Sequence, residues 1–190
     1  MSVTSAVHAR RGYFALAAAV LALDQLTKVV VHAKLPGIGV VEVIPGVFNL
    51  LYSRNPGGLF GYFSDMADPW RMLLLTVFPL LAVGLIVAFL LSAEGAERIT
   101  LFGLALILGG ALGNLLDRVF RGEVVDFLDV YVSHGGLSQW LVDRFGTAHW
   151  PTFNVADSGI VTGACLLVLD MVRGRPAAEQ GTAADERAPR

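Results

Sequence analysis

Several polar side chains in this sequence stand at the ends of long apolar segments, where each needs a physical reason. The candidates are Asn55, Asn114, Asp117, Arg118, Asp126, Asn154 and Asp157. An acid, amide or guanidinium at the end of a membrane-length helix is costly unless it pairs or faces water, so each is a candidate site residue. Two carboxylates in one low-dielectric pocket do not both ionise readily, so one keeps a proton near neutral pH while the other stays charged. Such a pair can supply both the base and the acid for hydrolysis of an amide bond.

The composition indicates that these residues are carried by membrane-spanning helices. Hydrophobic residues make up 55% of the chain and charged residues 16%, whereas an ordinary soluble domain has about 25% charged residues. Stretches of roughly 20 apolar residues are long enough to cross a bilayer. We predict four spans, at about 13–35, 72–93, 99–120 and 153–172.

The length of the chain and the order of these segments predict one domain with its polar residues gathered at one membrane face. The domain covers residues 1–173, with outer loops at 36–70 and 121–152, and residues 174–190 form a disordered tail without apolar periodicity. Arg10 and Arg11 before the first span, and Arg173 and Arg175 after the last, favour both termini in the cytoplasm. We therefore expect the candidate residues to meet near the outer face.

The loop between the first two spans has strand character. Residues 40–44 and 47–52 are rich in β-branched and aromatic residues and are separated by Pro45 and Gly46, which indicates a turn. Residues 124–132 are also predicted to be extended, and residues 133–151 to be an outer loop. The predicted fold class is therefore an all-α membrane protein with four transmembrane helices and a small extracytoplasmic β-rich loop domain between helices 1 and 2.

Two features of the spans concern helix packing and charge. Gly109 and Gly113 are four residues apart, which lets another helix approach closely. Asp24 and Lys28 are also four apart, with the acid first, so they can neutralise each other. This pair is either a structural ion pair or a part of the site that faces the substrate.

Composition and spacing exclude several classes of function. A formal net charge of -2 offers no basic face for nucleic acid, and a lone Cys165 excludes an internal disulfide or a cysteine metal cluster. His134 and His149 lie far apart in one loop without a zinc-binding helix motif, so we expect no metal site.

Five segments together resemble a known family. They are 23–28 (LDQLTK), 55–61 (NPGGLFG), 113–118 (GNLLDR), 124–127 (VVDF) and 153–157 (FNVAD). In this order and on four spans they resemble the motifs of lipoprotein signal peptidase (signal peptidase II), the bacterial membrane enzyme that removes signal peptides from prolipoproteins.

The resemblance implies a specific site. Asp126 and Asp157 would form a catalytic aspartate dyad, with Asp129 as a neighbour outside it. The substrate-binding and site-ordering residues would be Asn55, Gly57, Asn114, Asp117, Arg118, Asn154, Asp24 and Lys28. In this set Asp117 would brace Arg118, and Asp24 and Lys28 would brace the site.

The same resemblance implies the substrate and the location. The substrate would be a prolipoprotein whose cysteine carries diacylglycerol, cut on the N-terminal side of that cysteine. The enzyme would be a multi-pass protein of the bacterial inner membrane, in contact with membrane lipid, and we expect a monomer without a cofactor.

The sequence departs from the family pattern in two places. Pro56 and Leu59 replace residues that are usually small, which affects the predicted shape of that loop. The connection from Asp126 to Phe153 is long, with extra residues from 133 onward, and predicts an enlarged outer flap.

Three other functions remain as alternatives. A small proton- or ion-coupled membrane carrier also places acids beside Lys and Arg, but it needs a polar path across the bilayer and here the second span is apolar. A scaffold would use its polar residues only to hold helices together. A presenilin-like protease would carry a G-x-G-D motif, which these spans lack.

Overall fold

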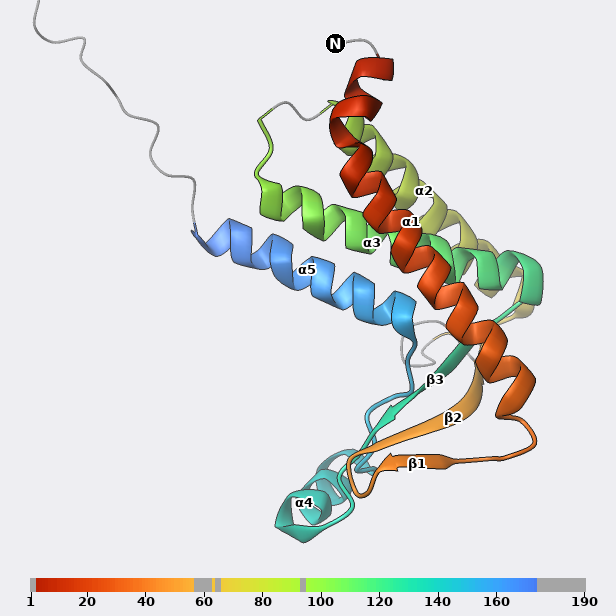
Figure 1. Cartoon of the computed structure of the whole chain (residues 1–190). Helices are drawn as coiled ribbons and strands as arrows, with labels where there is room; N and C mark the ends of the chain where they lie inside the picture. The colour runs from red at the N-terminus through yellow and green to blue at the C-terminus, as the bar shows by residue number, and fades with distance from the viewer. Residues whose placement is uncertain (1–2, 57–62, 64–65, 93–94, 174–190) are drawn as a thin grey trace, which may run out of the picture.

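The chain forms a group of long helices with a small β-sheet at one end (Figure 1). The computed structural model describes residues 3–56, 63, 66–92 and 95–173. Four of its helices are long and apolar enough to cross a membrane: α1 (Val3–Lys34), α2 (Asp68–Ser92), α3 (Arg98–Arg121) and α5 (Val155–Arg173). The predicted fold class is therefore confirmed. The tail at 174–190 lies outside the described residues, and the division of the chain at residue 173 stays a prediction.

The helix ends differ from the predicted spans for local reasons. α1 begins at Val3, before the predicted start at residue 13, because Arg10 and Arg11 favour helix and continue it. α5 begins at Val155, because Asn154 precedes it as the N-cap. The start of α1 and the end of α5 both lie at the end of the helical group that is away from the sheet (Figure 1).

Three antiparallel strands form the sheet in the order β1 (Val41–Ile44), β2 (Phe48–Asn55) and β3 (Val124–Val130). Gly46 has a φ of 79° between β1 and β2, so the predicted turn is present. The extended segment predicted at 124–132 supplies the third strand. The sheet thus joins the segment after α1 to the segment after α3, and it brings Asn55 opposite Val124, two residues from Asp126.

The chain after β3 turns back and runs along the free edge of that strand. Trp150 donates its N–H to the Val130 carbonyl at 2.8 Å, and Phe153 donates to the Leu128 carbonyl at 3.1 Å. This return carries the start of α5 to a position beside Asp126.

Part of the loop prediction for 133–151 was wrong. An 11-residue helix, α4 (Gly135–Phe145), occupies the tip of this excursion. Gly146 ends it with a φ of 77° and an N–H bond to the Val142 carbonyl at 2.8 Å, a common helix C-cap. The enlarged outer flap expected from the sequence is therefore a helix held at the end of the sheet (Figure 1).

Close packing around α3 fixes the end of the bundle that carries the polar residues. α3 packs against α1, α2 and α5. A Cβ atom at Gly109 would lie 2.5 Å from the Ala17 carbonyl oxygen of α1, and one at Gly113 would lie 2.5 Å from Oδ2 of Asp24. The predicted close approach at both glycines is thus present. An apolar cluster that includes Val31 and Phe127 packs the end of α1 against β3.

Candidate active site

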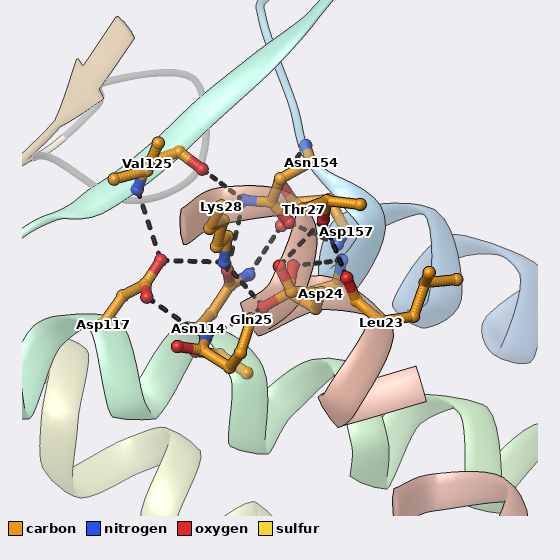
Figure 2. A network of polar contacts seen from close by, with 12 residues as sticks. Leu23, Asp24, Gln25, Thr27, Lys28, Asn114, Asp117, Val125, Asn154 and Asp157 are labelled. Atoms are coloured by element: carbon orange, nitrogen blue, oxygen red, sulfur yellow. Dashed lines mark hydrogen bonds and ion pairs between the residues drawn. The ribbon is translucent and has the colours of Figure 1, made fainter. Parts of the chain in front are cut away.

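A buried ammonium group stands at the centre of the polar residues (Figure 2). Lys28 Nζ lies 2.9 Å from Asp24 Oδ2 and 2.8 Å from Asp117 Oδ2, and it donates to Asn114 Oδ1 at 3.0 Å. Lys28, Asp24 and Asp117 are each 0% exposed. All three N–H donors of Lys28 therefore have partners, which is what a buried cation requires. The ion pair predicted between Asp24 and Lys28 is present, with Asp117 as a further anion.

The carboxylate of Asp117 connects α3 to the sheet. Its Oδ2 accepts the backbone N–H of Val125 at 3.3 Å, next to Asp126 in β3. Its Oδ1 pairs with Arg121 and accepts from Gln25 Nε2 at 3.2 Å. We expected Asp117 to brace Arg118, but its hydrogen bonds go to these groups and to Lys28, because residues next to each other on a helix point in different directions.

Two residues of this network were missed in the sequence. Arg121 donates to Gln25 Oε1 at 3.0 Å and pairs with Asp117, so both residues hold the Asp117 carboxylate in place. Arg121 lies four residues after Asp117, a spacing that favours an ion pair on a helix and that was available as a signal. Gln25 had no such signal, since its partners are far away in the sequence.

Asp24 ties α1 to the first turn of α5. Its Oδ1 accepts the backbone N–H of Ala156 at 2.9 Å, 132 residues away in the sequence. The first N–H groups of a helix have no partner within the helix, so this contact satisfies one of them. The start of α5 is thereby fixed against α1.

Asn154 and Asp157 form a reciprocal cap at the start of α5. Asn154 Oδ1 accepts the Asp157 N–H at 3.0 Å, and Asp157 Oδ2 accepts the Asn154 N–H at 3.2 Å. This is the arrangement of a capping box, with an aspartate in the place of the usual glutamate. Asp157 Oδ1 also accepts from Asn114 Nδ2 at 2.7 Å. Two hydrogen bonds therefore orient the Asp157 carboxylate, and a third fixes its backbone.

Asp126 is held by two asparagine side chains and is 1% exposed. Asn154 Nδ2 donates to its Oδ1 at 2.7 Å, and Asn55 Nδ2 donates to its Oδ2 at 2.9 Å. The pKa of Asp126 is raised from 3.8 to about 6, mainly by burial and also by the charge of Asp157, against the lowering effect of the two asparagine hydrogen bonds and of Lys28. A carboxyl group with this pKa can both give and take a proton close to neutral pH.

Arg118 lies at the edge of the site, beside a cavity. Its Nη1 donates to the Asn114 carbonyl at 3.4 Å. The cavity has a volume of about 250 Å³. It is lined by Pro56, Arg71, Met72, Leu75, Arg118 and Gly122. Gly57, the remaining predicted site residue, lies outside the described residues.

Asp129 belongs to a different cluster, although it follows Asp126 closely in β3. Its side chain is 2% exposed and accepts from Asn49 Nδ2 at 2.9 Å. His149 Nδ1 lies 2.9 Å from Asp129 Oδ1. His149 thus contacts the sheet through Asp129, and Asp129 fastens the returning segment to β3.

The structure therefore brings together the described site residues that were predicted, from α1, β2, α3, β3 and the start of α5. Two carboxylates, Asp126 and Asp157, share Asn154 as a common hydrogen-bond partner. The buried ion network of Lys28, Asp24 and Asp117 fixes the elements that carry them (Figure 2). This arrangement has the groups needed for acid and base catalysis on a peptide bond.

Comparisons with known proteins agree on one family. The family model described as Signal peptidase (SPase) II matches residues 16–173. A lipoprotein signal peptidase of Solibacter usitatus (strain Ellin6076) is 41% identical over 160 residues, covering 84% of this chain and 90% of the relative. Another, of Nitratidesulfovibrio vulgaris (strain DP4), is 42% identical over 166 residues, covering 87% of this chain and 92% of the relative.

Solved structures give the same result for the fold. One bacterial membrane enzyme superposes with a TM-score of 0.68 at 26% identity, covering 85% of this chain and 88% of that protein. A second has the same TM-score and identity, with 86% and 94% covered. Sequence, motif order and fold thus agree, and the chain belongs to the signal peptidase II family.

Proposed function

We propose that this protein is an aspartyl endopeptidase that removes signal peptides from diacylglyceryl-modified prolipoproteins, cutting on the N-terminal side of the lipidated cysteine. Membership of the signal peptidase II family supports a membrane protease, and its relatives are named lipoprotein signal peptidases. The observation that carries the aspartyl mechanism is the placement of Asp126 and Asp157 on either side of Asn154.

The two aspartates divide the proton transfers between them. Asp157, as a carboxylate, takes a proton from the attacking water, while Asp126 donates a proton to the carbonyl oxygen of the scissile bond. The resulting gem-diol collapses when the C–N bond breaks: the amine receives the proton from Asp157, and a diol hydroxyl returns its proton to Asp126. The pKa of about 6 for Asp126 suits this role, because a group near neutrality both gives and takes protons readily.

The asparagines hold the two carboxyl groups in fixed positions relative to each other during these steps. Asn154 contacts both, and Asn114 connects Asp157 to Lys28. Because these donors are already in place, the acids lose little freedom when the substrate binds, and correct placement can account for a large part of a rate enhancement. Lys28, Asp24 and Asp117 act through these residues and are positioning residues.

The orientation in the membrane follows from charge and helix direction. Arg10 and Arg11 lie in the N-terminal part of α1, and Arg173 is the last residue of α5. Both of these helix ends point away from the sheet (Figure 1). Basic residues are enriched on the cytoplasmic side, so both ends of the chain would be cytoplasmic and the sheet and dyad would lie near the outer face of the inner membrane.

The lipid on the substrate then has a physical role. Acyl chains that remain in the bilayer would hold the modified cysteine at the depth of the dyad and convert membrane anchoring into orientation. We propose that the cavity of about 250 Å³ beside Arg118 receives a segment of the substrate chain. The carrier alternative loses its basis, because family membership and the shared placement of the two acids point to hydrolysis.

The test is cleavage of a purified prolipoprotein in detergent, with and without the diacylglyceryl group, followed by mass spectrometry. We expect cleavage of the lipidated form only, and a product that begins at the lipidated cysteine. Equal cleavage of the unmodified protein would contradict the lipid requirement, and a product cut elsewhere would contradict the cleavage position.

A further inference from the structure

The helix α4 has no part in the site described above, and it exposes large apolar side chains. All residues of Gly135–Phe145 are described and none of them is buried. Leu137 and Trp140 are each 57% exposed and Phe145 is 64% exposed. Helices in proteins are normally stabilised by burial of an apolar face, so a helix of this kind needs an apolar partner outside the chain.

The side chains of α4 are divided between two faces. Leu137, Trp140 and Leu141 are spaced by three and four residues, so they share one side of the helix, and Phe145 follows Leu141 by one turn. The opposite side carries a polar pair, in which Gln139 Nε2 donates to Asp143 Oδ1 at 2.8 Å. The apolar and polar faces are those of a helix that lies at the boundary between an apolar phase and water.

The exposed apolar surface continues from the membrane helices to α4. In α1, Leu26 is 65% exposed, and beyond the end of α1, Ile38 and Val40 are 63% and 61% exposed. Val43, Ile44 and Val47 are also exposed, the last two on either side of the β1–β2 turn.

That turn contacts the beginning of the α4 excursion. Ser133 donates its N–H to the Gly46 carbonyl at 3.2 Å, and Tyr131 donates to the Val47 carbonyl at 2.9 Å. The apolar surface that starts on a membrane-length helix therefore extends along the sheet to α4, and Figure 1 shows α4 at the end of the sheet, to the side of the helices.

We propose that α4 docks onto the phospholipid bilayer, in the leaflet on the side of the sheet, with Trp140 and Phe145 inserted among the lipid headgroups and upper acyl chains. Tryptophan is enriched at this depth, and the Arg144 side chain is long enough to reach the headgroups from the same face. The charges of Asp143 and Arg144 cancel, and residues 131–153 contain no lysine. The attachment is therefore apolar, and it does not require anionic lipid.

Fluorescence quenching in lipid nanodiscs that hold one copy of the protein tests this proposal. The chain has three tryptophans, so Trp70→Phe with Trp150→Phe leaves Trp140 as the only reporter. The matched control carries Gln139→Trp together with Trp70→Phe, Trp140→Phe and Trp150→Phe, which moves the reporter to the polar face of the same helix. Each variant is first shown to retain the thermal midpoint of the wild-type protein.

We expect lipid brominated in the upper acyl chain to remove more than about half of the Trp140 fluorescence, since an interfacial helix buries its apolar face about 5–10 Å deep. The Gln139→Trp reporter should respond to aqueous iodide instead, and phosphatidylcholine discs should give the same result as discs with added phosphatidylglycerol. Iodide quenching of Trp140 equal to that of the control, without quenching by lipid, would overturn the proposal. Protection of Trp140 only in densely packed proteoliposomes would also overturn it, and would identify a second copy of the chain as the partner.

Discussion

Asn154 donates its side-chain N–H to Asp126 at 2.7 Å, across 28 residues of sequence. The same residue is the N-cap that precedes α5, and its backbone N–H donates to Asp157 Oδ2 at 3.2 Å. The first residue before a helix thus contacts both acids of the proposed dyad. The N-cap residue of α5 therefore also sets the position of one acid relative to the other.

Replacing Asn154 with serine separates these two tasks. Serine is a good N-cap, so α5 should keep its start. Its single hydroxyl is shorter than the amide, so when it accepts the Asp157 N–H it does not also reach Asp126 Oδ1, which the Asn154 Nδ2 contacts. We expect kcat to fall by about 10- to 100-fold, as for other small misplacements of reacting groups, with little change in the thermal midpoint. Asn49→Ser is the matched control, since Asn49 also donates to a buried aspartate, Asp129, outside the dyad. Equal kcat values for the two variants would contradict the role of Asn154.

The contact between α3 and α5 depends on a glycine. A Cβ atom at Gly110 would collide with the carbonyl oxygen of Ala156, in the first turn of α5 next to Asp157. Gly110→Ala should therefore lower the free energy of unfolding by about 1–3 kcal/mol and also reduce cleavage. Gly84→Ala is the control, because nothing lies within 4 Å of that position in α2. Thermal unfolding and activity are measured together, and a Gly110→Ala protein as active as Gly84→Ala would show that this spacing does not matter.

The buried Lys28 should be essential for stability. Lys28→Met leaves Asp24 and Asp117 as buried acids without their common cation. Removing one partner from a buried ion network typically costs about 3–5 kcal/mol, so we expect a large loss of unfolding free energy. Lys34→Met, at the exposed end of α1, should change it by less than about 0.5 kcal/mol. Similar unfolding curves for the two variants in detergent would contradict the network.

Asp126 should make the protein less stable as pH rises. The pKa of its carboxyl is raised by burial to about 6 in the folded protein, against 3.8 for the free group. The folded state therefore binds this proton more tightly. The contribution of Asp126 to stability is fully present below about pH 4 and is lost as pH rises through about 6, by up to about 3 kcal/mol. Asp126→Asn should lack this component. Unfolding free energies at pH 4 and pH 7 test it, and the same difference in wild type and variant would exclude a raised pKa.

Local sequence patterns were sufficient for much of the fold. Apolar runs predicted the four long helices, Pro45 and Gly46 predicted the first turn of the sheet, and the spacing of Gly109 and Gly113 predicted close helix packing. The ion pair of Asp24 with Lys28 followed from a spacing of four. Each of these features depends on residues that are near one another in the chain.

Features that depend on distant contacts could not be predicted in this way. The bond between Lys28 and Asp117 and the position of Gln25 arise only when α1 and α3 pack together. The helix α4 was missed because Gly135 stands at its start and Gly146 follows its end. None of its residues is buried, so its apolar pattern is short and weak. The resemblance to a family supplied the expected roles of Asp126 and Asp157, which spacing alone could not separate from those of Asp117 and Asp129.

The most direct test of the account compares three aspartates in one cleavage assay with a lipidated prolipoprotein. Asp126→Asn and Asp157→Asn keep the size of the side chain but remove its acid and base function, so each should lower the rate by at least about 100-fold while the protein stays folded. Asp129→Asn is the control, a buried acid in the same strand that bonds to Asn49 and His149, and it should retain cleavage. Wild-type rates in either Asp126→Asn or Asp157→Asn would contradict the proposed dyad.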